Sequence, residues 1–211
     1  NLPTDAELLL AQRLLRREDA ELLEHVESFL REVEPRSPLV SITSPLSLLT
    51  ELFTMRGAGT LVKRGSAIQR LDSYEGADLV RLEALLEASF GHDLRDEFFS
   101  RPPLAIFLEE DYRGAAILEP TDVGPYLSKF AVEPVAQGEG MGRDLWQAMA
   151  REFPRMFWRT RADNPIASWY LTVSDGMLRH ADWHVFWRGI EPALVPRIVE
   201  SAIAVGDDFV R

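Results

Sequence analysis

Three cationic side chains, Lys129, Arg159 and Arg161, have the residue types and the spacing that an anionic ligand requires. Lys129 lies in an apolar run, Tyr126 to Val132, that is typical of a β-strand. The two arginines stand two residues apart in the next predicted strand, 155–161, so they share one face of it. A guanidinium is a planar fork that suits a carboxylate, and an ammonium adds a point charge. Three converging cations would suit a dicarboxylate, whereas cations facing water or nearby acids would be structural, and the pattern alone leaves both open.

A glycine-rich segment, Gln137 to Gly142, connects the first of these strands to a predicted helix with an apolar stripe. Its order is Gln-x-x-Gly-x-Gly, and glycines of this kind form turns between elements. Strand, glycine loop and helix is a general arrangement for binding phosphate, because the first N–H groups of the helix lack internal partners. The dinucleotide fingerprint and the Walker pattern are both absent. A tight turn without a ligand is therefore the alternative interpretation.

The composition argues against several classes of site. The net charge of −11 disfavours nucleic acid as the main partner, since phosphate neutralisation needs a basic surface. No apolar run approaches the roughly 18 residues of a membrane span. The absence of cysteine excludes disulfides and thiolate chemistry and fits an intracellular protein. The four histidines have no metal-ligand spacing, so we expect no metal. The first residue is Asn rather than Met, which predicts an excised or processed piece of a longer protein.

Apolar periodicity predicts strands and helices in alternation along the chain. Before residue 65 we expect helices over 4–15, over the segment that ends at Pro35, and after Pro45, with short strands at 39–43 and 60–62. From residue 67 the predicted order is strand 67–71, helix 78–88, hairpin 105–108 with 114–118, strand 126–132, the helix after the glycine loop, strand 155–161, a polar turn-rich segment 162–182, strand 183–187 and helix 191–204. This order predicts an α/β fold with a mixed sheet.

Alternation along the strands also predicts which side chains share a face. Lys129 is expected on the face of Leu127 and Ala131, and the two arginines on the face of Phe157. The acidic pair in the hairpin turn, Glu110–Asp111, is expected in solvent. The helix over 78–88 is expected to direct four leucines inward, namely Leu79, Leu82, Leu85 and Leu86.

The order of elements from residue 67, with Gln-x-x-Gly-x-Gly after the central strand, resembles that of the GNAT acetyltransferases. In that superfamily the loop amides grip the pyrophosphate of coenzyme A. The resemblance implies an α/β fold with a mixed, mostly antiparallel central sheet flanked by helices, and acetyl-CoA as co-substrate without a metal. The residues that it implies for binding acetyl-CoA are Phe130, Ala131, Val132, Gln137, Gly138, Gly140, Met141, Gly142 and Arg143.

Longer motifs resemble the acetyltransferase domain of N-acetylglutamate synthase, of the vertebrate-like class that includes bacterial bifunctional synthase/kinases. The motifs are Tyr126–Phe130, Phe157–Pro165, Trp169–Tyr170 and Ser174–Gly176, within a similarity that extends from Thr50 to Gly189. The resemblance implies transfer of an acetyl group to the amine of L-glutamate, in arginine biosynthesis or urea-cycle regulation. It implies a catalytic Tyr170 near the coenzyme sulfur. The residues that it implies for holding the glutamate carboxylates are Lys129, Arg159, Arg161 and Asn164.

One position departs from the family. A substrate-binding lysine that follows Phe-Gly in the family is replaced by His92, which would weaken the contact or transfer it to a neighbour such as Arg95. GNAT enzymes transfer acetyl directly in a ternary complex, and the lack of cysteine agrees with this. Tyr170, with an ordinary pKa of about 10, would donate a proton to the departing thiolate. The general base is left open among Glu133, His184 and a water chain.

The segment Glu51–Thr60 resembles the C-terminal signature of arginine-sensitive acetylglutamate kinases, of the amino-acid kinase family, except that Leu46 stands in place of the family's histidine. The resemblance implies a C-terminal remnant of an amino-acid kinase domain and a linker at 1–64, the acetyltransferase domain at 65–211, and L-arginine as an effector. We expect a homo-oligomer without nucleic-acid or membrane partners, in the cytoplasm, or in mitochondria if the source is eukaryotic.

Two alternative functions stay open at this level. The chain could be a GNAT protein that acts on another amine, such as a protein N-terminus. It could instead be a regulatory or assembly module that binds acetyl-CoA or partner chains without turnover. The apolar stripes of the first 60 or so residues favour the second alternative, since they would need a neighbouring domain to cover them.

Overall fold

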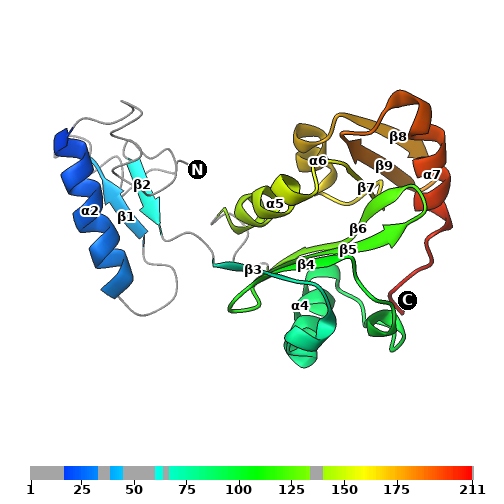
Figure 1. Cartoon of the computed structure of the whole chain (residues 1–211), viewed down its shortest axis with the longest axis horizontal. Helices are drawn as coiled ribbons and strands as arrows, with labels where there is room; N and C mark the ends of the chain where they lie inside the picture. The colour runs from blue at the N-terminus through cyan, green and yellow to red at the C-terminus, as the bar shows by residue number, and fades with distance from the viewer. Residues whose placement is uncertain (1–16, 33–38, 45–59, 64–66, 134–139, 211) are drawn as a thin grey trace. The chain divides into compact units, whose positions relative to one another are not determined.

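The computed structural model of the chain (Figure 1) describes residues 17–32, 39–44, 60–63, 67–133 and 140–210. The chain divides into two compact units, Asn1–Gly65 and Ser66–Arg211, which we describe separately. The predicted helix over 4–15 and nearly all of the signature at 51–60 lie outside the described residues. The assignment of the first unit to a kinase remnant therefore stays a prediction.

The first unit contributes one described helix and one strand pair. Helix α2 (Arg17–Glu32) buries Val26, whereas Phe29 is 53% exposed. Strand β1 (Leu39–Ile42) pairs antiparallel with β2 (Thr60–Lys63). These elements match the predicted second helix and the two predicted short strands. The helix predicted between the strands lies outside the described residues.

The second unit is built on a seven-stranded sheet. In order across the sheet, the strands are β3 (Ile68–Leu71), β4 (Ala105–Glu109), β5 (Gly114–Thr121), β6 (Gly124–Val132), β7 (Met156–Arg161), β9 (Trp183–Arg188) and β8 (Gly176–His180). Neighbouring strands are antiparallel except β6 and β7, which are parallel. This confirms the predicted α/β fold with a mixed, mostly antiparallel sheet. The hairpin of β4 and β5 is also confirmed, with Glu110 and Asp111 exposed in its turn.

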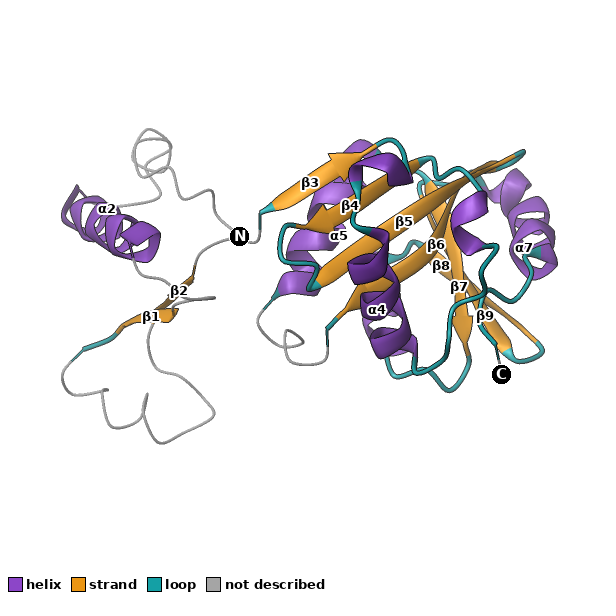
Figure 2. Ribbon diagram, turned by 90° about the horizontal axis from the view of Figure 1, so that it is seen from below, coloured by secondary structure: helices purple, strands orange, loops and turns teal. Residues whose placement is uncertain are grey.

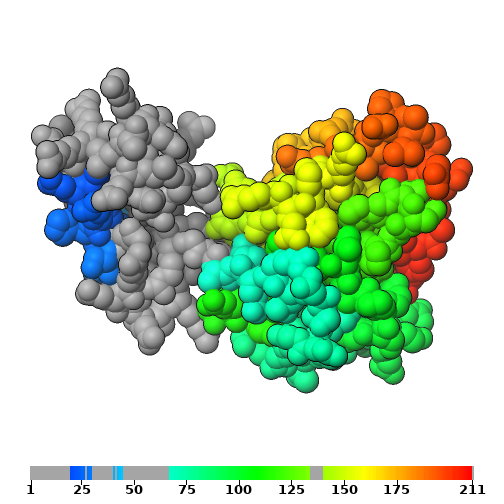
Figure 3. Space-filling view, in the orientation of Figure 1, coloured from blue at the N-terminus to red at the C-terminus, as the bar shows by residue number. Residues whose placement is uncertain are grey.

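Helices cover both faces of this sheet (Figures 1 and 2). Helices α5 (Met141–Glu152) and α6 (Ala167–Val173) lie over one face, and α4 (Leu79–Phe90) and α7 (Val195–Ala204) over the other. Three short 3₁₀ helices are described as well: η1 (Tyr74–Gly76), η2 (Phe98–Ser100) and η4 (Pro192–Leu194). In Figure 3 the red surface of α7 meets the green surface of the β5–β6 turn, where Arg197 lies 3.3 Å from Asp122.

The segment 162–182, predicted to be polar and turn-rich, contains two regular elements, so that prediction is wrong. Helix α6 has only seven residues, too few for an apolar stripe to show its period. Strand β8 lies at the sheet edge with Leu178 and Arg179 exposed, so it lacks the alternation of a half-buried strand. The inward prediction for Leu79 is wrong too. This residue begins α4 and is 37% exposed, because the buried leucine stripe starts one turn later.

An extra residue in β6 changes the direction of its side chains. Adjacent residues of β5 pair with Lys129 and with Leu127, so Ser128 forms a β-bulge. Lys129 therefore lies on the face opposite Leu127, and the prediction that they share a face is wrong, because the bulge shifts the alternation by one residue. Ala131 does lie on the face of Lys129, as expected.

Strands β6 and β7 separate soon after they begin to pair. Both strands are described throughout, and their parallel ladder holds two residue pairs, Tyr126 with Phe157 and Leu127 with Trp158. Beyond these pairs β7 and β9 turn away from the direction of β6 (Figure 2). Strand β6 continues in a ladder with β5 alone. Within the described parts of the chain, one backbone edge of β6 therefore has no neighbouring strand at this point.

The close approach of Trp187 to β8 predicts that Gly176 tolerates no side chain. A Cβ atom at Gly176 would lie 2.4 Å from Cζ2 and 2.7 Å from Cε2 of the Trp187 ring. We expect Gly176→Ala to lower the free energy of unfolding by ~1–3 kcal/mol, because the ring and the strand must move apart. Urea denaturation followed by tryptophan fluorescence measures this change. Gly206→Ala is the control, since nothing lies within 4 Å of its Cβ position. Equal losses in both variants would contradict the steric explanation.

Candidate active site

Two cavities adjoin in the second unit where β6 and β7 separate. We call the first the cationic cavity, with a volume of about 850 Å³, and the second the aromatic cavity, with about 880 Å³. Both are lined by Phe90, Ser128, Arg159, Thr160, Asn164 and Pro165. The cationic cavity alone contains His92, Lys129, Arg161 and Asp208, and the aromatic cavity alone contains Phe130, Gly142, Trp169 and Tyr170. Volumes of this size are typical of ligand sites, and two ligands, one in each cavity, would meet at the shared wall.

The residues predicted to hold glutamate carboxylates all line the cationic cavity. They are Lys129, Arg159, Arg161, Asn164 and His92. They come from β6, from β7, from the turn after β7 and from the loop after α4. Arg95, the neighbour considered in place of His92, is not among the residues that line either cavity. The structure therefore brings the predicted set together around one space.

Lys129 is a buried cation with three hydrogen bonds. Its side chain is 6% exposed, and Nζ donates to Oδ2 of Asp208 at 2.5 Å. Nζ also donates to Oγ and to the carbonyl oxygen of Ser128, at 3.1 and 3.3 Å. The rings of Phe98 and Phe209 have their centroids 4.9 and 5.5 Å from Nζ. Burial lowers the pKa of Lys129, and the Asp208 carboxylate opposes this shift because it stabilises the ammonium.

Arg159 is anchored by the end of α7. Its guanidinium donates to the carbonyl oxygens of Ala202 at 2.8 Å, Ile203 at 3.3 Å and Gly206 at 2.9 Å. These carbonyls belong to the last turn of the helix and the residues after it, where the helix dipole is negative. The contacts place Arg159 on the face of β7 that carries Phe157, as the alternation predicts.

Arg161 has fewer partners than the other two cations. Its guanidinium lies 4.0 Å from Asp182, and its side chain is 32% exposed. Among the residues that the structure describes, none accepts a hydrogen bond from this guanidinium. The guanidiniums of Arg159 and Arg161 each lie 4.0 Å from the centroid of the Trp183 ring. This contact restricts the orientation of both guanidinium planes. Arg161 is therefore the cation with the most donors available for a ligand.

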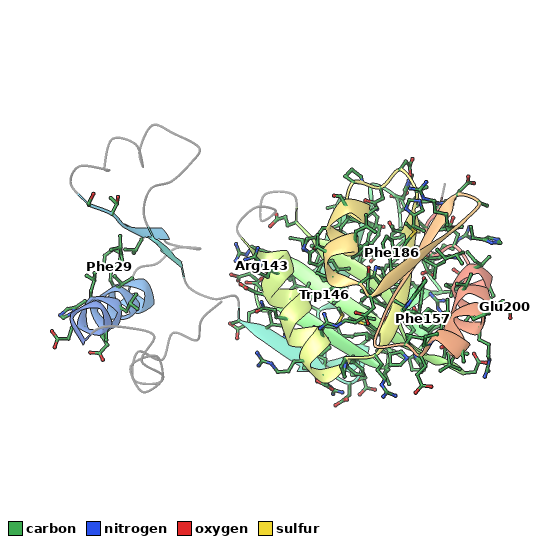
Figure 4. The ribbon with its side chains drawn as sticks, turned by 90° about the horizontal axis from the view of Figure 1, so that it is seen from above. Phe29, Arg143, Trp146, Phe157, Phe186 and Glu200 are labelled. Carbon is green, nitrogen blue, oxygen red and sulfur yellow. The ribbon has the colours of Figure 1, made fainter. Side chains whose placement is uncertain are left out.

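The aromatic cavity reaches the N-terminal end of α5. Gly140 caps this helix in the left-handed conformation that favours glycine, with φ 85°. A Cβ atom at Gly142 would lie 3.7 Å from Val132 and 3.9 Å from Phe130, so the start of the helix packs closely on β6. Arg143 also lines the cavity and lies at the N-terminal end of α5 (Figure 4). Unpaired N–H groups at a helix start, together with an arginine, suit a phosphate.

The residues predicted to bind acetyl-CoA divide into three groups. Those that line the aromatic cavity are Phe130, Val132, Gly140, Gly142 and Arg143. Ala131 and Met141 are buried and line neither cavity, since Ala131 packs on the α4 side of the sheet and Met141 packs beside Gly114. Gln137 and Gly138 lie outside the described residues.

Tyr170 is buried between α6 and the sheet and lines the aromatic cavity. Its ring centroid lies 5.4 Å from that of Trp158 and 5.5 Å from those of Trp169 and Phe186. Burial raises the pKa of the Tyr170 hydroxyl, and neighbouring Tyr126 raises it further. The phenol is therefore protonated near neutral pH, and it can donate a proton or a hydrogen bond.

The two side chains named from the sequence as candidate bases do not line either cavity. Neither Glu133, which follows β6, nor His184, on β9, is among the lining residues. The sequence analysis did not identify Ser128 and Thr160 in the shared wall, or Asp208 beside Lys129. No local pattern marks these residues, because their role depends on which strands and segments become neighbours.

Neither a metal site nor a membrane-crossing helix is found in the part of the chain that the structure describes. There, no group of three or more His, Asp or Glu side chains is placed so that it would hold a metal ion. No helix in that part combines the length and the apolar character that crossing a bilayer requires.

Known proteins resemble this chain over most of its length. Residues 67–203 match the family model described as NAT, N-acetyltransferase, of N-acetylglutamate synthase. A protein named acetylglutamate kinase from Xanthomonas campestris is 41% identical over 199 residues, which cover 90% of this chain and 46% of that protein. The mitochondrial N-acetylglutamate synthase of Homo sapiens is 39% identical over 196 residues, which cover 90% of this chain and 36% of that protein. The chain thus spans less than half the length of these relatives.

A solved structure of a GNAT-family protein from Bacteroides thetaiotaomicron shares the fold, with a TM-score of 0.52 at 14% identity. The superposition covers 64% of this chain and 94% of that one. At this identity the likeness concerns the fold alone, whereas the family match covers more than half of the chain. The chain belongs to the family of the N-acetyltransferase of N-acetylglutamate synthase, and its second unit has the GNAT fold.

Proposed function

We propose that this chain transfers the acetyl group of acetyl-CoA to the amine of L-glutamate and so forms N-acetylglutamate. The observation that carries the proposal is the pair of adjoining cavities, one lined by cations and the other reaching a glycine-capped helix start. Their shared wall at Ser128, Thr160 and Asn164 is where an acetyl group and an amine would meet. Relatives named N-acetylglutamate synthase support the same activity.

The aromatic cavity suits acetyl-CoA as the donor. We infer that the pyrophosphate lies at the N-terminal end of α5, where the helix N–H groups and Arg143 would hold it. Gln137 and Gly138 would contribute from the loop before this helix. The acyl arm would follow the edge of β6 that has no ladder with β7, and N–H groups of that edge would polarise the thioester carbonyl. Tyr170 lines the same cavity and would lie near the sulfur.

The cationic cavity suits an acceptor with two carboxylates. Arg161 has donors available for a bidentate carboxylate contact. Arg159 and Lys129 would add positive charge from anchored positions, and Asn164 would add a hydrogen bond from the shared wall. His92 lines the cavity where the family resemblance implies a lysine, so we expect a weaker contact at that corner.

The transfer would be direct, between two substrates bound together. The glutamate amine, after losing a proton to water or a base, would attack the thioester carbonyl carbon and form the C–N bond. The C–S bond would break as the tetrahedral intermediate collapses. Tyr170 would give a proton or a hydrogen bond to the departing thiolate, since burial keeps its hydroxyl protonated. The chain has no cysteine to form an acyl-enzyme, which agrees with direct transfer.

We also propose a context for the chain within a longer protein. Relatives named acetylglutamate kinase match 90% of this chain, which supports an amino-acid kinase domain before the acetyltransferase domain. L-arginine would act as an effector through that domain, and the protein would assemble as a homo-oligomer. We expect it in the cytoplasm, or in mitochondria for a eukaryotic source, in line with the names of the human and mouse relatives.

The proposed activity predicts glutamate-dependent release of thiol. With acetyl-CoA and L-glutamate the chain should form N-acetylglutamate and free coenzyme A in equal amounts, measured by a thiol reagent and by mass spectrometry. L-Glutamine is the matched comparison, since it keeps the α-carboxylate and lacks the second one, and its kcat/KM should be at least ~10-fold lower. Coenzyme binding by a folded chain without turnover would instead indicate a binding module. Preferred turnover of a peptide N-terminus would indicate a different acceptor.

Replacement of Arg161 should separate the two substrates. We expect Arg161→Ala to raise the KM for L-glutamate about 10- to 100-fold, because a charge-assisted carboxylate contact contributes roughly 1.5–3 kcal/mol. The KM for acetyl-CoA should change less than about twofold, since Arg161 does not line the aromatic cavity. Arg197→Ala is the control, because Arg197 pairs with Asp122 at the surface and lines neither cavity. Equal rises in both KM values would show a structural role for Arg161.

Replacement of Tyr170 should act on turnover. We expect Tyr170→Phe to lower kcat about 10²-fold, as typical for a lost general acid, with the KM for acetyl-CoA nearly unchanged. In the parent chain the raised pKa keeps the acid form present, so kcat should show no loss from this group between about pH 7 and 9. Tyr74→Phe is the control, since Tyr74 is also buried but lines neither cavity. A Tyr170→Phe variant with full kcat would remove Tyr170 from catalysis.

A further inference from the structure

The residues that follow α7 are fixed against the loop that follows α4. Phe209 is buried, and its ring centroid lies 4.8 Å from that of Phe90. The N–H of Arg95 donates to the carbonyl oxygen of Asp208 at 2.9 Å, and a β-bridge joins Leu94 to Phe209. The backbone on both sides of the Asp208 carboxylate is therefore held in place, and the carboxylate itself is only 10% exposed.

The Asp208 carboxylate connects two cations that come from different parts of the sheet layer. Oδ2 accepts from Lys129 of β6, and Oδ1 accepts from Arg101, which follows η2. Arg101 also lies 3.7 Å from Glu119 of β5. Cations and carboxylates thus alternate through successive ion pairs, in the order Lys129, Asp208, Arg101 and Glu119. A buried charge of either sign is stable only when it is paired in this way.

A substrate could replace some of the hydrogen bonds of Lys129 more easily than others. An ammonium has three N–H donors, and the three bonds of Nζ account for all of them. Two of these bonds go to its own neighbour, Ser128, at 3.1 and 3.3 Å, and a substrate oxygen could take their place without any movement of the fold. The bond to Asp208 links segments that are 79 residues apart, so it sets where Nζ points.

The same part of the chain also anchors Arg159. The carbonyls of Ala202, Ile203 and Gly206 accept from its guanidinium, and Asp208 follows two residues after the last of them. We call residues 202–209 the anchoring segment. It supplies neutral carbonyl oxygens as acceptors to Arg159, and it supplies the negatively charged carboxylate of Asp208 to Lys129. Lys129 is the more deeply buried of the two and so depends more on its counter-ion.

We propose that Asp208 is a positioning residue for the acceptor substrate: it keeps Lys129 charged and aimed at the cationic cavity, so that a substrate carboxylate can bind there. This inference rests on the proposed function. The substrate oxygen replaces a bond from Lys129 to Ser128, and the bond to Asp208 persists. In this role Asp208 acts through Lys129.

The charges around Lys129 determine how the binding of a substrate carboxylate would depend on pH in a chain that lacks the Asp208 carboxylate. Asp208 and Glu119 favour the ammonium, while burial and Arg101 disfavour it. Arg159 and His92 also line the cavity that Lys129 faces. Without Asp208 the lowered pKa of Lys129 falls further, and the cation is lost as the pH rises through it. Binding of a carboxylate should then begin to weaken at a lower pH than it does in the parent chain, where Asp208 opposes the shift.

The test compares Asp208→Asn with the parent chain in steady-state kinetics between about pH 6.5 and 9. We expect the KM for L-glutamate to rise about tenfold near neutral pH, and to rise further toward alkaline pH, since a charge-assisted contact is weakened. The KM for acetyl-CoA should stay within about twofold. Asp208→Glu keeps the charge and should restore the pH dependence of the parent chain. Asp122→Asn removes one carboxylate from a surface ion pair and is the control for lost charge.

A double variant keeps the proposal testable if Asp208→Asn alone does not fold. Lys129→Met combined with Asp208→Asn replaces the buried pair by neutral groups, which are tolerated better than one unpaired charge. Its KM for L-glutamate should equal that of Lys129→Met alone. A further rise of about fivefold or more would show that Asp208 acts other than through Lys129, and would overturn the proposal.

Two more results would also overturn it: an Asp208→Asn variant with the parent KM for L-glutamate, or one with a raised KM that does not depend on pH. Either result, in a chain that releases thiol with glutamate, would leave the proposed function intact. A parent chain that releases no glutamate-dependent thiol would overturn the proposed function and this inference together.

Discussion

The separation of β6 from β7 is the constraint on which both cavities depend. Their parallel ladder ends after two residue pairs, and β6 goes on with β5 alone. Backbone groups on the open edge of a strand must find other partners, and water or a ligand can supply them. The bulge at Ser128 lies just beyond the last pair and shifts the alternation by one residue, so that Lys129 lies on the α4 side of the sheet and Phe130 on the side of Leu127. A single strand thereby supplies a cation to one cavity and an aromatic ring to the other.

Three cations line one cavity of a chain whose net charge is −11, and four aspartates line it with them: Asp163, Asp182, Asp207 and Asp208. At long range this net charge does not favour anionic ligands, but at contact distance in a partly buried site the nearest cations dominate. The cations are kept there by acceptors from the chain itself: the carbonyls after α7 for Arg159 and the Asp208 carboxylate for Lys129. Arg161, with fewer partners, remains available.

Local sequence patterns predicted the elements that have strong periodicity and failed where structure depends on distant partners. Apolar runs predicted β6 and β7, whereas the convergence of Lys129, Arg159 and Arg161 was left open, and the structure places all three around one cavity. The bulge at Ser128 was not predictable, because it is a property of the register with β5. Helix α6 is too short to show a period, so Tyr170 had no predicted element. Asp208 lies 79 residues from Lys129, a distance over which no spacing rule operates.

The anchoring segment also affects the order in which the site becomes complete while the protein is being made. The aromatic cavity takes its lining from residues 89–170, whereas the cationic cavity also needs residues 205–209. Because translation runs from the N-terminus, a nascent chain that has reached β9 already carries every residue that lines the aromatic cavity, while Asp208, the counter-ion of Lys129, has not yet been made. The cationic cavity is thus completed late in maturation, when a short stretch of backbone docks on a structure that is otherwise formed.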